Sequence, residues 1–216
     1  MAVYLPVMLD VWGKRCVVVG GGKVAERKTL GLLDAGAAIT VISPVLTPQL
    51  SELSEQASIV WLNRIYAPGD ARGAFLVYAA TDDPAVNVEV AREADSLGVP
   101  VNVGSDAEAG SFITPGVLRR GRLTVAVSTS GAGPGTAAKI TKLLEETFGE
   151  EYEAYLDFLY KMRQEIKRQE PSLEARKALI KRLGTLNVLD EIRMGTFTEW
   201  DSEQIGTWIA QHREEY

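Results

Sequence analysis

The stretch from residue 16 to residue 28, CVVVGGGKVAERK, constrains the fold of this chain more than any other part of the sequence. An apolar run typical of a buried strand leads into three consecutive glycines and then into residues typical of a helix. Gly20, Gly22 and Ala25 fill the pattern G-x-G-x-x-G/A, which provides a tight turn, a close backbone approach to a pyrophosphate, and close packing of helix on strand. The stretch predicts a dinucleotide site. The simpler alternative is that the glycines serve only as a turn between a strand and a helix.

The first 103 residues alternate between strand patterns and helix patterns. Strands are expected at 16–20, 39–43, 58–62, 74–80 and 99–103, and helices at 24–34, 47–56 and 83–98. Two of these helices begin with a capping residue followed by proline, as Thr47–Pro48 and Asp83–Pro84. Regular alternation of this kind requires a parallel sheet with helices on both faces. We therefore expect an α/β fold that begins with a Rossmann-type domain.

The pattern changes after residue 111. Two apolar segments flank RRGR, residues 119–122, and the alternation at Leu123, Val125 and Val127 indicates antiparallel strands rather than another β–α unit. From Thr136 onward, helical patterns continue to the end of the chain. The sequence is expected to divide into a nucleotide-binding Rossmann domain over 1–110, a small β/helix region over 111–148 and a helical C-terminal domain over 149–216.

Charge and the scarcity of cysteine and histidine narrow the class of function. The net charge of −6 and the isoelectric point near 5.0 argue against nucleic acid or an anionic membrane as a partner. No apolar run approaches the roughly 20 residues of a membrane-spanning helix, and the first residues lack a signal-peptide pattern. A single cysteine, Cys16, fits a reducing cytosol, and a single histidine, His212, argues against a metal site. We expect a soluble, cytoplasmic protein without a bound metal.

The residues after the second expected strand leave the type of dinucleotide open. A typical NAD site has an acidic residue there, about 20 residues after the glycine loop, to hold the ribose hydroxyls. This chain has Ser43, Pro44 and Val45, and no arginine that would meet the 2′-phosphate of NADP. The residues alone do not decide between NAD and NADP.

Three segments resemble the precorrin-2 dehydrogenase family of sirohaem biosynthesis. They read VVVGGGKVAERKTLGLLDAGAAITVISP, then AATDDPAVN, then VNVGSDAEAGSFITPGVLRRGRLTVAVSTSGAGP. Their order is more specific than any one of them, and the similarity covers residues 3–150, with a looser helical match beyond. No methyltransferase domain like that of the fused sirohaem synthases follows, so the chain resembles the free-standing form.

The resemblance implies NAD-dependent oxidation of precorrin-2 to sirohydrochlorin. Some relatives also insert ferrous iron as a further substrate, without a metal site of their own. The family is typically a homodimer, in which the middle β segment and the helical part form much of the contact. This agrees with the antiparallel character of the 111–148 region, since an exposed sheet edge is normally covered or paired.

The resemblance also places cofactor-binding residues on this sequence. The residues implied are Gly20, Gly21, Gly22, Lys23 and Val24 at the pyrophosphate, Ser43, Pro44 and Val45 at the adenosine ribose, Thr81 and Asp82 on the nicotinamide side, and Asn102 and Val103 at the same crevice edge. These positions lie at or just after the carboxyl ends of the expected strands, where open α/β sheets bind ligands.

The catalytic candidate is Asp106. The family has an essential aspartate three residues after the asparagine of its N-V pair, suited to accept a proton as hydride leaves the macrocycle. Here that place holds Ser105, and the aspartate stands one residue later. The alternative is that Asp106 is a solvated turn former, as aspartate after Gly-Ser usually is.

Further residues are candidates for binding the carboxylates of the macrocycle. They are Ser111, Arg119, Arg120, Ser128, Thr129 and Ser130. Guanidinium groups pair with carboxylates through two hydrogen bonds, and a helix start after the serine-glycine segment also attracts anions. The alternatives are that the arginines belong to a solvated hairpin turn and that Ser128, Thr129 and Ser130 only cap the following helix.

Three other functions remain open at this point. A non-catalytic NAD(H)-sensing module would share the glycine loop, but such modules usually keep the acidic residue that this chain lacks. A chelatase without the oxidation step is suggested only by the displaced aspartate. A structural dimerisation protein with a relic cofactor fold is disfavoured by the intact set of Gly20, Gly22 and Ala25.

Overall fold

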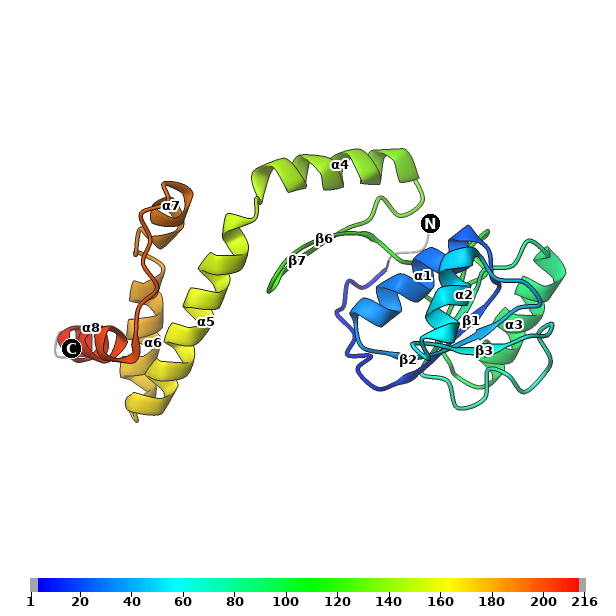
Figure 1. Ribbon diagram of the computed structural model, residues 1–216, viewed down its shortest axis with the longest axis horizontal. Coiled ribbons are helices and arrows are strands. Elements are labelled where there is room, and N and C mark those ends of the chain that lie inside the picture. Colours follow the sequence, from blue (N-terminus) through cyan, green and yellow to red (C-terminus); the bar gives the residue numbers. More distant parts are fainter. Residues whose placement is uncertain (1–3, 214–216) are drawn as a thin grey trace. The chain divides into compact units, whose positions relative to one another are not determined.

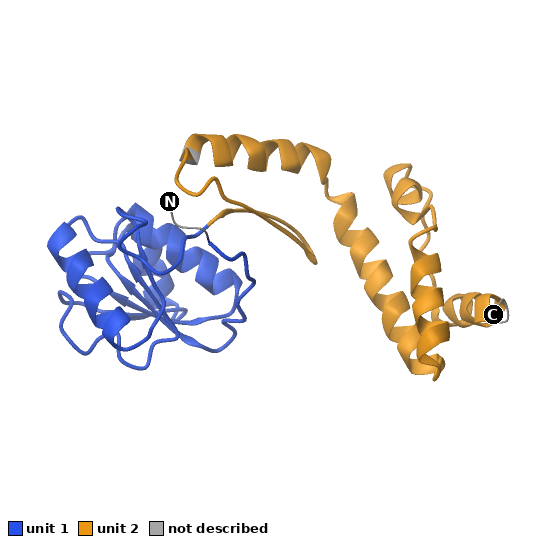
Figure 2. Ribbon diagram, turned by 180° about the vertical axis from the view of Figure 1, so that it is seen from behind, with its two compact units in different colours: residues 1–114 blue, residues 115–216 orange. Residues whose placement is uncertain are grey.

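The computed structural model describes residues 4–213 and contains two compact units, Met1–Thr114 and Pro115–Tyr216 (Figures 1 and 2). Residues 1–3 and 214–216, which the first and last expected domains include, lie outside the described residues. The observed boundary follows Thr114, four residues after the expected end of the first domain at 110. The separate 111–148 and 149–216 domains stay a prediction.

The first unit contains a five-stranded parallel sheet with the strand order β3-β2-β1-β4-β5 (Figure 1). Its strands are β1 (Arg15–Val19), β2 (Ala38–Ile42), β3 (Val60–Leu62), β4 (Leu76–Ala79) and β5 (Val101–Val103), and its helices are α1 (Lys23–Asp34), α2 (Pro48–Glu55) and α3 (Pro84–Ser96). The expected α/β fold and the order of its elements are confirmed. The third and fourth strands are shorter than the apolar runs predicted, because flanking residues such as Ile59 and Ala74 are buried without joining the ladder.

Side chains that alternate along each strand build one core on each face of the sheet. Cys16, Val18 and Tyr78 point to the face that α1 and α2 cover. Val17 and Val77, their immediate neighbours, point to the face that α3 covers. Because β1 lies between β2 and β4, the connection reverses direction at β1, and the carboxyl ends of these strands flank the crevice where such sheets bind ligands.

The two predicted proline-led helix starts are confirmed. The Thr47 hydroxyl accepts a hydrogen bond from the Leu50 N–H at 3.3 Å, and the Asp83 carboxylate accepts one from the Ala85 N–H at 2.8 Å. In each case a proline follows, which has no N–H to leave unpaired. These starts fix the loops that follow β2 and β4.

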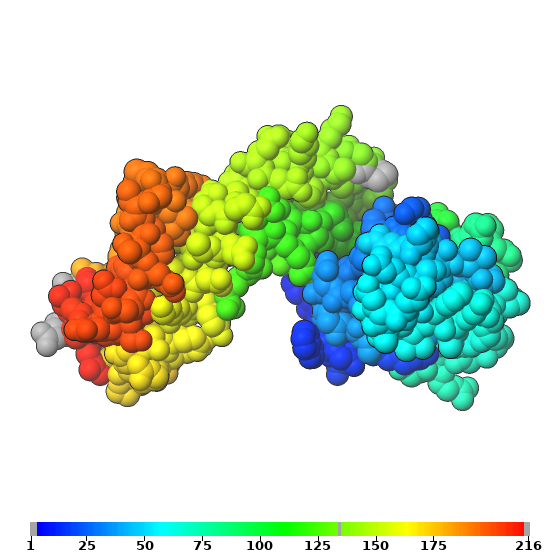
Figure 3. All heavy atoms as spheres, viewed as in Figure 1, coloured from blue at the N-terminus to red at the C-terminus, as the bar shows by residue number. Residues whose placement is uncertain are grey.

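The second unit begins with the antiparallel hairpin that the alternation predicted. Its elements are β6 (Gly116–Arg120), β7 (Leu123–Val127), α4 (Pro134–Thr147), α5 (Glu151–Gln169), α6 (Leu173–Leu183), α7 (Val188–Arg193) and α8 (Ser202–Arg213). α4 packs on the hairpin, as the green and yellow-green atoms show in Figure 3. The helices α5 to α8 enclose a core that includes Phe158, Met162, Ile166, Leu179 and Ile205.

α4 begins at Pro134, two residues before the expected start, since proline is accepted in the first helical turn. Its apolar stripe does not reach a core. Leu143 is 61% exposed and Ile140 38% exposed, and none of the α4 side chains that the structure describes is buried. No helix within residues 4–213 is both long enough and apolar enough to cross a membrane.

Candidate functional site

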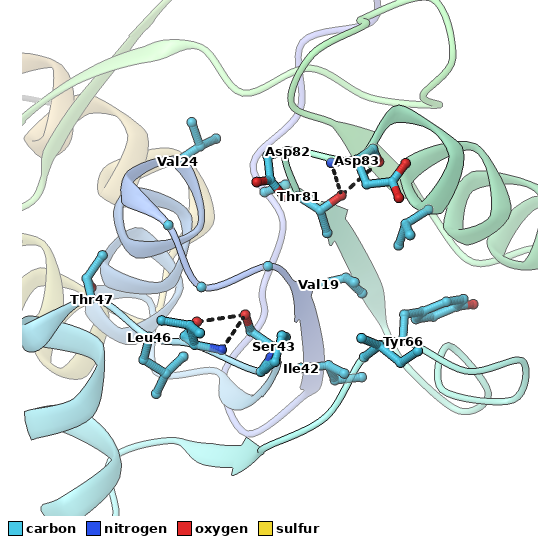
Figure 4. A pocket seen from close by; sticks show the side chains of 18 of the residues that line it. Val19, Val24, Ile42, Ser43, Leu46, Thr47, Tyr66, Thr81, Asp82 and Asp83 are labelled. Atoms are coloured by element: carbon cyan, nitrogen blue, oxygen red, sulfur yellow. Dashed lines mark hydrogen bonds between the residues drawn. The ribbon is translucent and has the colours of Figure 1, made fainter.

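A cavity of about 690 Å³ lies at the carboxyl ends of β1, β2 and β4 (Figure 4). It is lined by Val19, Gly20, Gly21, Gly22, Lys23, Val24, Ile42, Ser43, Pro44, Val45, Leu46, Thr47, Ile65, Tyr66, Ala80, Thr81, Asp82, Asp83 and Val86. The structure therefore brings together ten of the twelve residues predicted for the cofactor: 20–24, 43–45 and 81–82. It adds a wall that the sequence did not predict, formed by Ile65 and Tyr66.

The three glycines of the loop differ in what surrounds them. Gly20 has φ +120°, and a Cβ there would collide with the carbonyl oxygen of Ala80. A Cβ on Gly21 would collide with the carbonyl oxygen of Val45. A Cβ on Gly22 would meet no protein atom within 4 Å. Packing alone accounts for the first two glycines, whereas at Gly22 the open space fits the close approach of a phosphate group.

The start of α1 is suited to an anion. Gly22 is its N-cap and provides no side-chain hydrogen bond, so the first N–H groups of the helix keep no side-chain partner. Lys23 lies beside them, with its Nζ 2.9 Å from Oε1 of Glu26. The pKa of Glu26 is lowered, first by the hydroxyl of Thr47 and then by Lys23. Since this buried carboxylate stays ionised, Lys23 balances a negative charge that would otherwise repel a phosphate.

The segment after β2 is held rigidly against the glycine loop. The Thr47 N–H donates to the carbonyl of Gly21 at 2.9 Å, and the Ser43 hydroxyl donates to the carbonyl of Val45 at 2.7 Å. The indole N–H of Trp61 donates to the carbonyl of Ser43 at 2.8 Å. Among the described residues that line the cavity, Lys23 is the only cation, and the lining residues that directly follow β2, 43–47, carry no charge.

The loop after β4 is fixed by Asn87, which sequence analysis missed. Its side-chain oxygen accepts from the Thr81 N–H at 3.1 Å, and its side-chain nitrogen donates to the Thr81 carbonyl at 3.0 Å. The Thr81 hydroxyl also lies 2.9 Å from the same side-chain oxygen. Asn87 is 2% exposed. The sequence signal that could have identified it is its place between Val86 and Val88 in the expected helix over 83–98.

Asn102, Val103 and Ser111 are not among the residues that line the cavity. The side-chain amide of Asn102 donates to the carbonyl of Phe112 at 2.8 Å, and Val103 is 4% exposed. Ser111 accepts from the Val101 N–H at 2.8 Å through its hydroxyl. Through these contacts, the segment around Ser111 and Phe112 runs back along β5 and is bonded to it.

Asp106 lies on the loop after β5 and is exposed. Its Oδ1 accepts a hydrogen bond from the Glu108 N–H at 2.9 Å, which is a turn-forming contact. The loop begins beside the cavity, since a Cβ on Gly104 would lie 3.3 Å from Cγ1 of Val24, a lining residue. Asp106 itself is not among the lining residues.

The other candidates for carboxylate binding belong to the second unit. Arg119 is exposed, whereas Nε of Arg120 lies 3.2 Å from Oε1 of Glu150, an ion pair that lacks hydrogen-bond geometry. The candidates Ser128, Thr129 and Ser130 form the turn before α4, where the Ser130 N–H donates to the Ser128 hydroxyl at 3.1 Å and the Thr129 hydroxyl donates to the carbonyl of Gly133 at 3.2 Å. Within residues 4–213, no three His, Cys, Asp or Glu side chains are grouped to hold a metal ion.

Sequence comparison finds similar proteins of two lengths. A family model described as putative NAD(P)-binding matches residues 7–116. A siroheme synthase of Chromobacterium violaceum is 39% identical over 174 residues, which is 81% of this chain but only 37% of that protein. A precorrin-2 dehydrogenase of Bacillus subtilis is 36% identical over 159 residues, which is 74% of this chain and 98% of that protein. The chain thus spans little more than a third of the first relative and nearly all of the second.

Structural comparison finds a similar protein of matching length. The solved structure of SirC, a precorrin-2 dehydrogenase, superposes with a TM-score of 0.73 at 29% sequence identity. The match covers 99% of this chain and 100% of that one. The similarity therefore includes the helical second unit as well as the sheet.

Proposed function

Because this chain belongs to the precorrin-2 dehydrogenase family, we propose that it oxidises precorrin-2 to sirohydrochlorin in sirohaem biosynthesis, with NAD as the hydride acceptor. The observation that carries the proposal is the cavity over the glycine loop, where Gly22 leaves open space in front of the uncapped start of α1. A dinucleotide pyrophosphate needs that combination of space and unpaired N–H groups.

The absence of a cation after β2 supports NAD rather than NADP. The 2′-phosphate of NADP would lie near Ser43, where the described lining residues offer it no positive charge. The nearby Arg64 is held by Asp70, with two N–O distances of 2.7 Å. An added phosphate dianion would therefore remain without a partner, which is costly in a partly closed site.

In this proposal, Gly20 to Val24 hold the pyrophosphate, Ser43 to Val45 hold the adenosine ribose, and Thr81 and Asp82 lie on the nicotinamide side. The bound nicotinamide supplies the hydride acceptor. The chain's own contribution is to fix the two loops through Thr47 and Asn87, so that both edges of the crevice keep their positions. Asn102 and Val103 support the neighbouring edge at β5.

Asp106 is proposed to take the proton that the macrocycle loses. Its exposed carboxylate can leave the turn bond with Glu108 at small cost, because that bond is open to water. Ser111, Arg119, Arg120, Ser128, Thr129 and Ser130 are proposed to meet the carboxylates of the macrocycle. A homodimer, a cytosolic location and ferrous iron as a further substrate complete the proposal.

The test is anaerobic absorbance spectroscopy of precorrin-2 with the protein and NAD. We expect formation of NADH together with a sirohydrochlorin spectrum. Asp106→Ala should lower the rate by about 10²–10⁴-fold, the usual contribution of a positioned acid or base. Glu108→Ala is the matched control, because Glu108 is an exposed carboxylate on the same loop.

Equal rates in the two variants would assign the proton transfer to another group. If NAD binds but no NADH forms, the oxidation is wrong, and a sensing module or a chelatase becomes the better description. A second spectral change that depends on added ferrous ion would identify iron insertion.

A further inference from the structure

One wall of the cavity is formed by a segment without regular structure. Residues 63–75 connect β3 to β4 through turns alone. From this segment, Ile65 and Tyr66 line the cavity, and Figure 4 shows Tyr66 beside Ile42, at the end away from Val24. Ile65 is 73% exposed, so most of its apolar surface is open to a ligand.

Two carboxylates hold this segment in place. Glu93, from α3, accepts hydrogen bonds from the Tyr66 hydroxyl and, at 2.6 Å, from the N–H of Gly69. Asp70 accepts both 2.7 Å hydrogen bonds from Arg64 and a 2.8 Å bond from the N–H of Ala67. Hydrogen bonds to an ionised group are among the stronger ones in proteins, so a segment without a ladder of its own becomes rigid.

The segment is also fixed to the sheet. Arg15, the first residue of β1, donates to the carbonyl of Arg72 at 2.8 Å and to that of Asp70 at 3.1 Å. The wall is thus attached to β1 at one side and to α3 at the other. Because α3 also carries Asn87, the same helix fixes the wall and the loop after β4.

We propose that Glu93 is a positioning residue for the cofactor, which sets the Ile65–Tyr66 wall against which the adenine half of the dinucleotide packs. The proposal rests on the proposed use of NAD. An adenine ring is flat and largely apolar, and this end of the cavity offers Ile65 and Tyr66 facing the backbone-rich segment from Ser43 to Val45. Glu93 does not touch the cavity, so its effect on binding must pass through Tyr66 and Gly69.

The experiment compares the affinity for ADP-ribose, which is NAD without its nicotinamide, with that for nicotinamide mononucleotide, which lacks the adenosine and its phosphate. Glu93→Gln keeps the size of the side chain but leaves one acceptor oxygen for two donors. Tyr66→Phe keeps the ring and removes only the hydroxyl. Glu89→Gln is the matched control, because Glu89 is exposed and lies one turn earlier on α3. Thermal melting establishes that each variant is folded.

We expect Glu93→Gln and Tyr66→Phe each to weaken ADP-ribose binding by about fivefold, comparable to one hydrogen bond. The double variant should lose little more than either single variant, since both remove the same contact. Affinity for nicotinamide mononucleotide and kcat at saturating NAD should not change, while KM for NAD rises. Glu89→Gln should match the wild type throughout.

Two results would overturn the inference, and they have different meanings. If the wild type binds ADP-ribose and Glu93→Gln and Tyr66→Phe bind it equally well, Glu93 does not position the wall, and the proposed oxidation still stands. If the wild type does not bind ADP-ribose at all, the dinucleotide site itself is wrong.

Discussion

At the glycine loop, three adjacent glycines meet two different physical demands. Gly20 and Gly21 are surrounded by backbone oxygens that leave no room for a Cβ, whereas Gly22 faces open space. The first two positions therefore concern folding, and the third is the one proposed to concern the ligand. In this proposal a single motif combines a structural requirement with a functional one.

This separation predicts opposite phenotypes for neighbouring substitutions. Gly22→Ala should fold, with a loss in stability of about 1 kcal/mol or less, because alanine is a poorer N-cap than glycine. It should weaken NAD binding by tenfold or more, since the new methyl group occupies the phosphate space. Gly21→Ala should lose roughly 1–3 kcal/mol of stability through its collision with Val45. Thermal melting and an NAD titration of both variants distinguish the two effects, and similar melting temperatures would contradict this view.

The sequence predicted most of the residues that line the cavity, because strand ends and glycine positions follow from local patterns. It did not predict where side chains at those ends point. Asn102 stands at the correct strand end, yet its amide is used by the carbonyl of Phe112. Thr47 was predicted only as a helix cap, and Tyr66 was missed as a lining residue because nothing local marks a residue that a long-range contact brings into place.

Among the helices of the second unit, one buried carboxylate joins three elements. Glu170 follows the end of α5 and is 2% exposed. Its Oε1 accepts from the N–H of Ser172 at 2.8 Å, just before α6, and its Oε2 lies 2.5 Å from Nε of Arg213 at the end of α8. The N–H of Ser172, followed by the guanidinium of Arg213, lowers the pKa of Glu170.

A lowered pKa makes the stability of this unit depend on pH. Because the folded state binds the proton less readily than the unfolded state, the contribution of Glu170 is complete above its ordinary pKa of 4.5 and is lost as the pH falls below it. Glu170→Gln should therefore lower the melting temperature at pH 7 and flatten its change between about pH 5 and pH 3. Circular dichroism melts across this range provide the measurement. Parallel curves for variant and wild type would assign the pH dependence to other carboxylates.

At the scale of elements, local patterns were most informative where helices are amphipathic and strands are apolar. The five strands, the hairpin and the capping residues Thr47 and Asp83 follow the prediction. The predicted ends of the strands differ from the observed ones because apolar residues beyond the hydrogen-bonded strand residues are also buried. The short helix α7 (Val188–Arg193) has too few residues for a periodic pattern and was not separated from its neighbours.

At the scale of the whole molecule, the uncovered stripe of α4 supports the proposed homodimer. Leu143 and Ile140 lie one turn apart on α4 and are exposed in the single chain. Apolar residues that recur at helical spacing on an exposed face are typical of a surface that another chain covers.

If a second copy covers this stripe, a charge placed in it should prevent association. Leu143→Glu is expected to convert a dimer into a monomer, because an unpaired carboxylate would be buried in the contact. Lys142→Glu introduces the same group at a neighbouring exposed position and should leave the dimer intact. Sedimentation velocity of the wild type and both variants measures the state directly. A monomeric wild type would refute the homodimer.

The segment around Ser111 and Phe112, which covers the outer edge of β5, affects how the protein is expected to behave during expression. β5 is the last strand of the sheet, and Ser111 satisfies its outer side by bonding to both polar backbone groups of Val101. Asn102 fastens the same segment through the carbonyl of Phe112. An unprotected strand edge recruits other strands, which leads to aggregation. We therefore expect the yield of soluble protein from expression to depend on Ser111 and Asn102, two side chains for which the sequence had predicted a role in binding.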